Sequence, residues 1–152
     1  MTDTQTLPPP VNVFGDFLDE EVFIIGQFAQ NMAAKADDVV FTQDSHERAL
    51  YVVIEGRLAV QIRTADGDAL TVGTIEAGDV FGELSFLDGH VRTATIVCLE
   101  DAQLLRLPRQ GFDQLQADYP SIAAKLMSDL ALVVSLRLRA ADQLIARLSA
   151  RA

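Results

Sequence analysis

The sequence predicts a mainly β domain of the barrel or jelly-roll type, with helices before and after its strands. Three successive patterns along its 152 residues indicate this α+β fold class. Apolar residues at helical spacing occupy residues 13–35, short β-rich runs separated by turn residues continue to residue 108, and a long helical pattern starts near residue 118. A chain of this length is expected to form one domain with a core of its own.

The first pattern predicts one or two amphipathic helices over residues 13–35. Acidic residues such as Asp19, Glu20 and Glu21 lie between the apolar positions, as expected for a helix with one buried face. Residues 1–12 include three consecutive prolines and are predicted to be a flexible, extended leader to a domain over residues 13–152. The apolar positions are Phe14, Phe17, Leu18, Val22, Ile25, Phe28 and Met32.

Six short runs in the middle of the chain are predicted to be strands. In one of them Leu58, Val60 and Ile62 alternate with other residues, which predicts that all three side chains face the core. A later run loses its alternation at Gly73, which predicts a bulge or bend at that position. The runs are residues 39–41, 50–54, 57–63, 69–75, 93–99 and 102–107.

A long helix is predicted over about residues 118–150. Asp118 is the expected N-cap, and Pro120 lies in the expected first turn. Two apolar stripes follow this helix; one can pack on the strands, and the other needs a second partner. A second copy of the same helix is the simplest such partner, so a homodimer is expected. The stripes consist of Met127, Ala131, Val134, Leu138, Ala141, Ile145 and Leu148, and of Leu126, Leu130 and Val133.

The charge of the chain restricts its partners. A formal net charge of −10 repels phosphate backbones and anionic membranes, so direct DNA binding is not expected. An anionic ligand would have to be held by a local positive site, against the field of the whole chain. The residue pattern contains neither a secretion signal nor an apolar run that could span a bilayer, so a cytoplasmic location is expected.

Catalysis and metal binding are not expected from the residue types present. Cys98 lies in an apolar strand-like run and is expected to be a buried free thiol. His46 and His90 are the two histidines, and they form no cluster with cysteine that would hold a metal. No serine–histidine–aspartate or paired-carboxylate pattern stands out, so the protein is predicted not to be an enzyme and to need no cofactor.

The residues between positions 76 and 94 point to a ligand. Gly82 allows close backbone approach, and the residues after it suffice for a short helix whose free N–H groups favour an anion. Arg92 can bind two phosphate oxygens at once, Thr93 adds a hydroxyl donor, and Glu83 can accept a hydrogen bond from a sugar hydroxyl. The alternative is that Glu83 and Arg92 form a structural ion pair beside a loop.

This segment resembles the phosphate-binding cassette of the cyclic-nucleotide-binding domain family. The resemblance rests on the run FGELSFL that begins at Phe81 and on the run RTATI that begins at Arg92. The strands and turns before the cassette show the family's pattern as well. The resemblance implies an eight-stranded β-roll with N-terminal helices, a short cassette helix and a long C-terminal helix, as in the sensor domains of catabolite activators and of protein kinase A regulatory subunits.

The resemblance further implies a non-catalytic sensor that binds cAMP or cGMP. Arg92 would hold the cyclic phosphate and Glu83 the ribose 2′-hydroxyl. Val72 and Ile75 would line the base, and the final helix would cover the base as a lid, with Arg137 positioned to cap it. The remaining ligand contacts would come from Phe81, Gly82, Leu84, Ser85, Thr93 and Ala94.

Two features of the sequence leave alternatives open. The turn at residues 43–45 differs from the Glu-Gly-Asp that is usual in the family, and Arg137 lies where relatives carry polar residues that read the base. An ordinary exposed arginine is the alternative for Arg137, and the choice between cAMP and cGMP does not carry over. For the whole chain, the alternatives are the sensor half of a catabolite-activator-type transcription regulator without its helix-turn-helix, and a ligand-free dimerisation scaffold.

Overall fold

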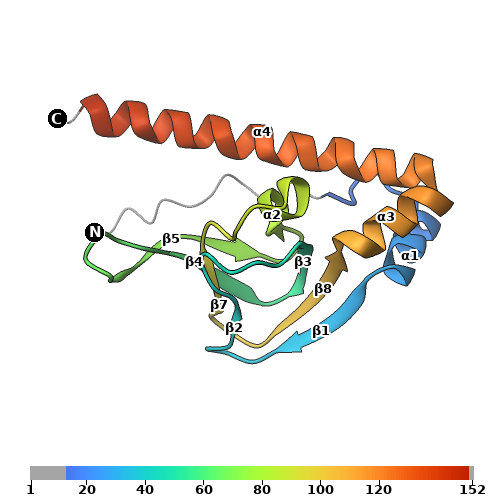
Figure 1. Cartoon of the computed structure of the whole chain (residues 1–152), viewed down its shortest axis with the longest axis horizontal. Helices are drawn as coiled ribbons and strands as arrows, with labels where there is room; N and C mark the ends of the chain where they lie inside the picture. The colour runs from blue at the N-terminus through green and yellow to red at the C-terminus, as the bar shows by residue number, and fades with distance from the viewer. Residues whose placement is uncertain (1–12, 151–152) are drawn as a thin grey trace.

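The computed structural model describes residues 13–150, so the prediction of a flexible leader over residues 1–12 lies outside the described residues. Strands form a roll, and helices α1, α3 and α4 pack at its side (Figure 1). In chain order the elements are α1 (Asp19–Gln27), β1 (Gln30–Ala34), β2 (Val39–Phe41), β3 (Ala49–Glu55), β4 (Arg57–Arg63), β5 (Ala69–Glu76), β6 (Val80–Phe81), α2 (Glu83–Asp88), β7 (Thr95–Cys98), β8 (Ala102–Pro108), α3 (Arg109–Asp118) and α4 (Pro120–Ala150).

The strands form two antiparallel sheets of four strands each. Their strand orders are β1-β8-β3-β6 and β2-β7-β4-β5. The eight-stranded β-roll is therefore confirmed, and each of the six strands predicted from the sequence is present with small shifts of its ends. The two strands that were not predicted are β1 and β6.

The prediction of helices throughout residues 13–35 is wrong. Helix α1 covers only Asp19–Gln27, and the last part of the segment is strand β1. This strand pairs with β8, from Gln30 opposite Arg106 to Ala34 opposite Ala102. A complete backbone ladder along the edge of the sheet outweighs the weak helical preference of five residues.

The pairing of β4 with β5 contains the expected irregularity. Val60 lies opposite Gly73 and Gln61 opposite Thr71, so Val72 is an additional residue in β5 and the predicted bulge is confirmed. Leu58 is fully buried as predicted, but Ile62 is 38% exposed. The prediction that Ile62 faces the core is wrong because, beyond the bulge, this end of β4 borders an open cavity.

Two groups of apolar side chains form the core. One group lies inside the roll and includes Leu58, Ile96 and the free thiol of Cys98, which is buried as predicted. The other group joins the helices to the outer side of the sheet that contains β3 and β8, and Phe112 and Leu126 are among its fully buried members. The second group therefore fixes the position of the N-terminal part of α4 against the domain.

Helix α4 is the predicted long helix, but its N-cap prediction is wrong. Asp118 is the last residue of α3, a helix that was not predicted, and Pro120 is the first residue of α4. The stripe formed by Leu126, Leu130 and Val133 is buried against the domain. The other stripe becomes solvent-exposed toward the C-terminal half, where Leu138, Ile145 and Leu148 are 56–61% exposed and the helix runs past the roll (Figure 1).

No helix within residues 13–150 is at once long enough and apolar enough to cross a bilayer.

Gly56 in the tight β3–β4 connection gives a direct test of the packing of the roll. Its φ is +99°, and a Cβ atom there would lie 2.6 Å from the Asp101 carbonyl oxygen. We expect Gly56→Ala to lower the free energy of unfolding by about 2–4 kcal/mol, from left-handed backbone strain plus the backbone clash. The measurement is urea denaturation.

The matched control is Gly67→Ala, which has a similar φ of +88° but no atom within 4 Å of the added Cβ. It should cost only about 1–2 kcal/mol, the strain alone. Equal losses in the two variants would contradict the close packing at Gly56.

Candidate ligand site

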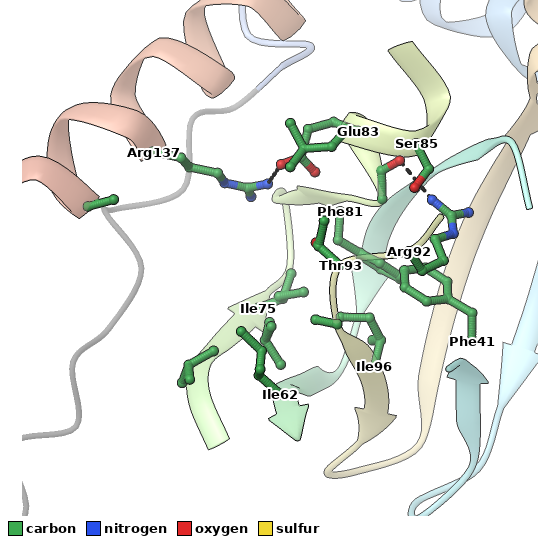
Figure 2. Close-up of a pocket in the computed structure, with 16 residues that line it drawn as sticks. Phe41, Ile62, Ile75, Phe81, Glu83, Ser85, Arg92, Thr93, Ile96 and Arg137 are labelled. Carbon is green, nitrogen blue, oxygen red and sulfur yellow. Dashed lines mark hydrogen bonds and ion pairs between the residues drawn. The ribbon is translucent and has the colours of Figure 1, made fainter. Parts of the chain in front are cut away.

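A cavity of about 410 Å³ opens between the roll, α2 and α4 (Figure 2). Every site residue predicted from the sequence lies on its wall, including Val72 and Ile75 from β5 and Arg137 from α4. The sequence did not predict the other lining residues, of which four come from strands, where apolar residues are typical of the core, and one comes from α4. These further residues are Phe41, Val60, Ile62, Ile96 and Ala141.

The cavity has two chemically different ends. Glu83, Ser85, Arg92 and Thr93 gather at the end near α2, together with Arg137 of α4. Ile62, Ile75 and Ile96 lie away from that end (Figure 2), and Val60, Val72 and Ala141 are further aliphatic residues of the lining. A ligand that fits this lining has one polar or charged part and one flat or apolar part.

Gly82 brings the backbone into contact with the charged end. It is the N-cap of α2, with a φ of +74°, and a Cβ at this position would lie 2.6 Å from Nη1 of Arg92. Only glycine accommodates both the left-handed backbone and the close guanidinium. The predicted short helix is confirmed as α2, and the first N–H groups of a helix have no partner within the helix itself.

Two arginines hold the other end of α2. Arg48 donates to the carbonyl oxygens of Phe86 and Leu87, at 3.0 and 2.8 Å, and Arg109 donates to Phe86 at 3.1 Å. Cations are stabilising at the C-terminus of a helix because they neutralise its unpaired carbonyl groups. The orientation of α2 is therefore fixed by the loop before β3 and by the start of α3.

Arg92 lies below α2 and is only 1% exposed. Its Nη1 donates to the carbonyl oxygen of Gly82 at 2.9 Å, and Nη2 donates to Glu47 and to the carbonyl oxygen of Ala49, each at 2.8 Å. The guanidinium also lies 4.0 Å from the centre of the Phe41 ring. Its Nε is buried and has no hydrogen-bond partner among the described residues. A buried cationic donor without a partner is costly, so this site is suited to accept an anionic group.

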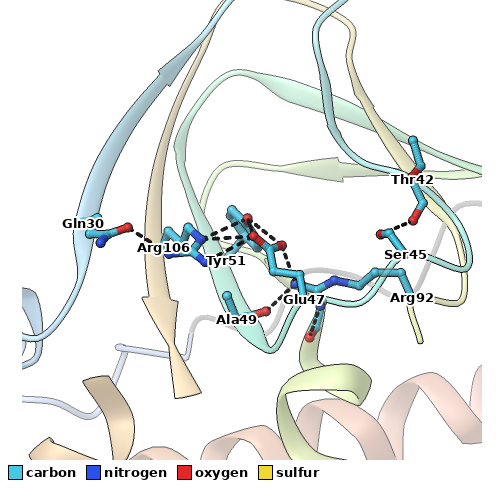
Figure 3. Close-up of polar contacts among 9 residues, drawn as sticks. Gln30, Thr42, Ser45, Glu47, Ala49, Tyr51, Arg92 and Arg106 are labelled. Carbon is cyan, nitrogen blue, oxygen red and sulfur yellow. Dashed lines mark hydrogen bonds and ion pairs between the residues drawn. The ribbon is translucent and has the colours of Figure 1, made fainter. Parts of the chain in front are cut away.

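Glu47 is the counter-ion of Arg92 and was not predicted, because nothing in the pattern of its loop marks it. Its carboxylate also accepts a hydrogen bond from the Tyr51 hydroxyl and pairs with Arg106 (Figure 3). Burial alone would raise the pKa of Glu47, but hydrogen bonds from Arg92 and Tyr51 and the charges of both arginines hold it below 4.5. Burial and the Glu47 carboxylate raise the pKa of Tyr51 to about 12, so its hydroxyl stays protonated and donates.

Glu83 is paired with Arg137 rather than with Arg92. Its Oε1 lies 2.7 Å from Nη1 of Arg137, while Nη2 of the same arginine bonds Asp79 at 2.8 Å and the carbonyl oxygen of Val80 at 2.6 Å. The alternative of a structural ion pair between Glu83 and Arg92 is therefore wrong. So is the alternative of an ordinary exposed arginine at position 137, whose side chain is 18% exposed.

Asp79 is the second carboxylate held by Arg137. It is 4% exposed and also accepts the N–H of Val80. Burial raises the pKa of Asp79, and the charge of Glu83 raises it further, whereas Arg137 acts in the opposite direction. Arg137 is therefore the cation that offsets two neighbouring carboxylates, of which Glu83 lines the cavity.

The chain belongs to the cyclic nucleotide-binding domain family, whose model matches residues 32–119, more than half of the sequence. The match includes the cassette residues and both sheets of the roll. The expected family membership is thereby confirmed.

Among known proteins, the chain is similar to the cyclic AMP receptor protein of Thermus thermophilus, with 31% identity over 130 residues, 86% of this chain and 58% of that protein. It is also similar to the neuropathy target esterase sws of Drosophila melanogaster, with 28% identity over 137 residues, which is 85% of this chain but 9% of the esterase. The chain thus spans a small part of the esterases and somewhat more than half of the receptor.

Solved structures support the same family. The catabolite activator protein of Thermus thermophilus superposes with a TM-score of 0.81 at 29% identity, covering 91% of this chain and 63% of that one. A cyclic nucleotide-binding domain from Methylobacillus flagellatus also gives a TM-score of 0.81, at 27% identity, with 88% of this chain and 76% of that chain covered.

Glu47 gives a test of the electrostatics of the site. We expect Glu47→Gln to lower the free energy of unfolding at pH 7 by about 1–3 kcal/mol, because it leaves the buried Arg92 without a counter-ion. Because the folded protein lowers the pKa of Glu47, its contribution is present above pH 4.5 and is lost as the pH falls through the lowered pKa. Urea denaturation from pH 7 to pH 3 should therefore show the two proteins converging below about pH 4.5.

A matched control is Asp44→Asn, which removes the exposed partner of Arg63. It should change stability at pH 7 by less than about 1 kcal/mol. A difference between wild type and Glu47→Gln that stays constant down to pH 3 would contradict the assigned role of Glu47.

Proposed function

We propose that this domain is a non-catalytic sensor that binds a cyclic mononucleotide, cAMP or cGMP. The observation that carries the proposal is Arg92, a buried arginine on the cavity wall whose Nε has no partner among the described residues. Membership of the cyclic nucleotide-binding domain family supports the choice of ligand.

The cyclic phosphate would bind between Arg92 and the first turn of α2. Arg92 contributes a full positive charge, and the phosphodiester is a single anion that can accept several hydrogen bonds. Ser85 and Thr93 line the same end of the cavity, and the N–H groups of Gly82, Leu84, Ser85 and Ala94 would complete the shell. Glu47 and the carbonyl groups already hold the far side of the guanidinium, so Arg92 is preorganised for the phosphate.

The ribose would bind at Glu83, next to the phosphate. Only Oε1 of Glu83 is bonded to Arg137, and Oε2 makes no hydrogen bond with the described residues. An ionised carboxylate accepts a hydrogen bond from the 2′-hydroxyl and rejects a ligand without it.

The base would occupy the aliphatic end of the cavity, against Val72 and Ile75, with Ala141 of α4 above it. Contacts from both the roll and α4 would make the position of α4 depend on the ligand, which is the requirement for a sensor. Arg137 lines the cavity beside Glu83 and is already bonded to three acceptors, so it is not assigned to the base.

Binding without catalysis is the chemistry that the lining residues support. No histidine, cysteine or lysine lies among the described residues of the cavity wall. The hydroxyl groups of Ser85 and Thr93 therefore have no neighbouring imidazole or amine that could act as a general base, and the Glu83 carboxylate at the same end is paired with Arg137. The esterase relatives do not change this view, because the match covers 9% of their length.

We further infer that two copies of the chain associate through α4. The apolar side chains of Leu138, Ile145 and Leu148 are exposed on one helix at intervals of seven and three residues. This spacing suits a two-helix seam, and burial of the stripe would remove the apolar surface from water.

Arg92 tests the proposal directly. Wild type should bind cAMP or cGMP in isothermal titration calorimetry, and Arg92→Ala should weaken binding by at least about 2 kcal/mol, because the desolvated cation is lost. Arg92→Lys keeps the charge without the planar guanidinium and should also weaken binding. Circular dichroism reports whether each variant is folded, and Arg63→Gln, an exposed arginine at the end of β4, is the matched control.

A ligand analogue avoids any doubt about folding of the variants. The 2′-deoxy form of the nucleotide should bind wild type about tenfold or more weakly, because it leaves the Glu83 carboxylate without its hydroxyl donor. Unchanged affinity for the deoxy analogue would contradict the ribose assignment, and no binding of either nucleotide to wild type would overturn the proposed function.

The seam is tested separately by Ile145→Glu. In analytical ultracentrifugation, wild type should sediment as a dimer and Ile145→Glu as a monomer, because a charge is placed in an apolar seam. Gln143→Glu, which adds the same charge at an exposed position off the seam, should leave the dimer intact. A monomeric wild type would contradict the inference.

A further inference from the structure

We propose that Arg106 is a positioning residue that keeps the Nε donor of Arg92 free for the ligand. It does so by holding the second oxygen of Glu47 away from that donor. The inference rests on the proposed function, since it assigns the free donor to an anionic ligand. Arg106 is not among the described residues of the cavity wall, so it acts on the ligand only through its neighbours.

The pairing of Glu47 with Arg92 uses only one edge atom of the guanidinium. Nε and Nη2 of an arginine lie on the same edge, and the two oxygens of a carboxylate can bind this edge together. Glu47 accepts from Nη2 at 2.8 Å through Oε1, yet Nε has no partner within residues 13–150. The carboxylate is ionised at pH 7, so something else must keep its second oxygen from the free donor.

The second oxygen of Glu47 is held by Arg106 and Tyr51 (Figure 3). Oε2 accepts hydrogen bonds from Nε of Arg106 at 3.2 Å and from the Tyr51 hydroxyl at 2.9 Å, and Nη2 of Arg106 also lies 3.2 Å away. A turn of the carboxylate toward Nε of Arg92 would break these contacts. Arg106 and Tyr51 therefore favour the pairing through one oxygen, which leaves the Arg92 donor unoccupied.

The register of the sheet fixes the position of Arg106. In β8 it lies opposite Tyr51 of β3 on one side and opposite Gln30 of β1 on the other. Its Nη1 donates to Gln30 at 2.9 Å. Tyr51 in turn lies opposite Phe81 of β6, and their rings stack with centres 4.9 Å apart. Residues directly opposite each other in antiparallel strands have neighbouring side chains, so this row crosses all four strands and ends at Phe81 in the cavity wall.

The charges favour the same role for Arg106. Glu47 is paired with two arginines, so one carboxylate and two guanidinium groups together carry a net charge of +1. Without Arg106, the remaining pair would be neutral, and both oxygens of Glu47 would be available to Arg92. A phosphate would then compete with Glu47 for the same donor and meet less positive charge behind it. Loss of Arg106 should therefore weaken the binding of an anion.

The test follows the Arg92 Nε–H signal by NMR without ligand, in wild type and in Arg106→Gln. In the variant, Glu47 should turn to Nε, so the signal should move downfield and exchange more slowly with solvent. The signal is assigned by its loss in Arg92→Lys. Arg57→Gln, which changes an exposed arginine at the start of β4, is the matched control and should leave the signal unchanged.

Isothermal titration calorimetry gives the effect on the ligand. Arg106→Gln should bind cAMP or cGMP about tenfold more weakly than wild type, and Arg57→Gln should bind as wild type does. Arg106→Lys keeps the charge and can still donate to Glu47, so it should recover part of the loss. In a Glu47→Gln background, the further loss from Arg106→Gln should be less than about threefold, because Arg106 acts through Glu47.

A second variant serves if circular dichroism shows that Arg106→Gln is poorly folded. Tyr51→Phe keeps the ring that stacks on Phe81 and removes only the hydroxyl that restrains Glu47. It should move the Arg92 Nε–H signal in the same direction as Arg106→Gln.

The outcomes distinguish the two proposals. If wild type binds neither nucleotide, the proposed function fails, and the assignment of the free donor to a ligand fails with it. If wild type binds nucleotide, the function stands, and the role of Arg106 is overturned by either of two results. One is an Arg92 Nε–H signal that is the same in Arg106→Gln as in wild type, and the other is an unchanged affinity of that variant.

Discussion

The buried guanidinium of Arg92 is the contact around which the site is arranged. It joins three parts of the chain, namely the loop at Glu47, the start of β3 at Ala49 and the turn at Gly82 that begins α2. A cation that is 1% exposed needs several acceptors, and the described residues supply three, at Nη1 and Nη2, but none at Nε. The burial of Arg92 thus accounts for two features, the Nε donor without an acceptor and the position of α2, whose first turn is bonded to the guanidinium through Gly82.

The proposed binding of an anion has to be reconciled with the acidity of the chain. With a net charge of −10, the field of the whole protein opposes a phosphate, and only a local arrangement of donors can overcome it. Glu47 offsets the charge of Arg92 from behind, and Arg137 offsets Asp79 and Glu83 on the opposite wall. These charged groups therefore have partners of opposite sign, while Arg92 Nε and Glu83 Oε2 have no hydrogen-bond partner within residues 13–150.

The sequence predicted the parts of the structure that depend on local patterns. The alternation in β4, the bulge near Gly73 and the long helix α4 were found because period and turn residues determine them. Strand β1 was predicted as helix because only its pairing with β8 makes it a strand. Glu47 was missed for a related reason. Its role depends on a contact with Arg92, 45 positions away in the sequence, and no local pattern predicts that contact.

The central claim is that Arg92 binds an anionic ligand. It is tested most directly by the NMR signal of the Arg92 Nε–H group. The side-chain N–H signal of Arg92 can be followed by NMR during a titration with cAMP or cGMP, and assigned by its loss in Arg92→Lys. A phosphate that bonds this donor should move the signal strongly downfield and slow its exchange with solvent. An Arg92 Nε–H signal that is unchanged at saturating nucleotide would contradict the account.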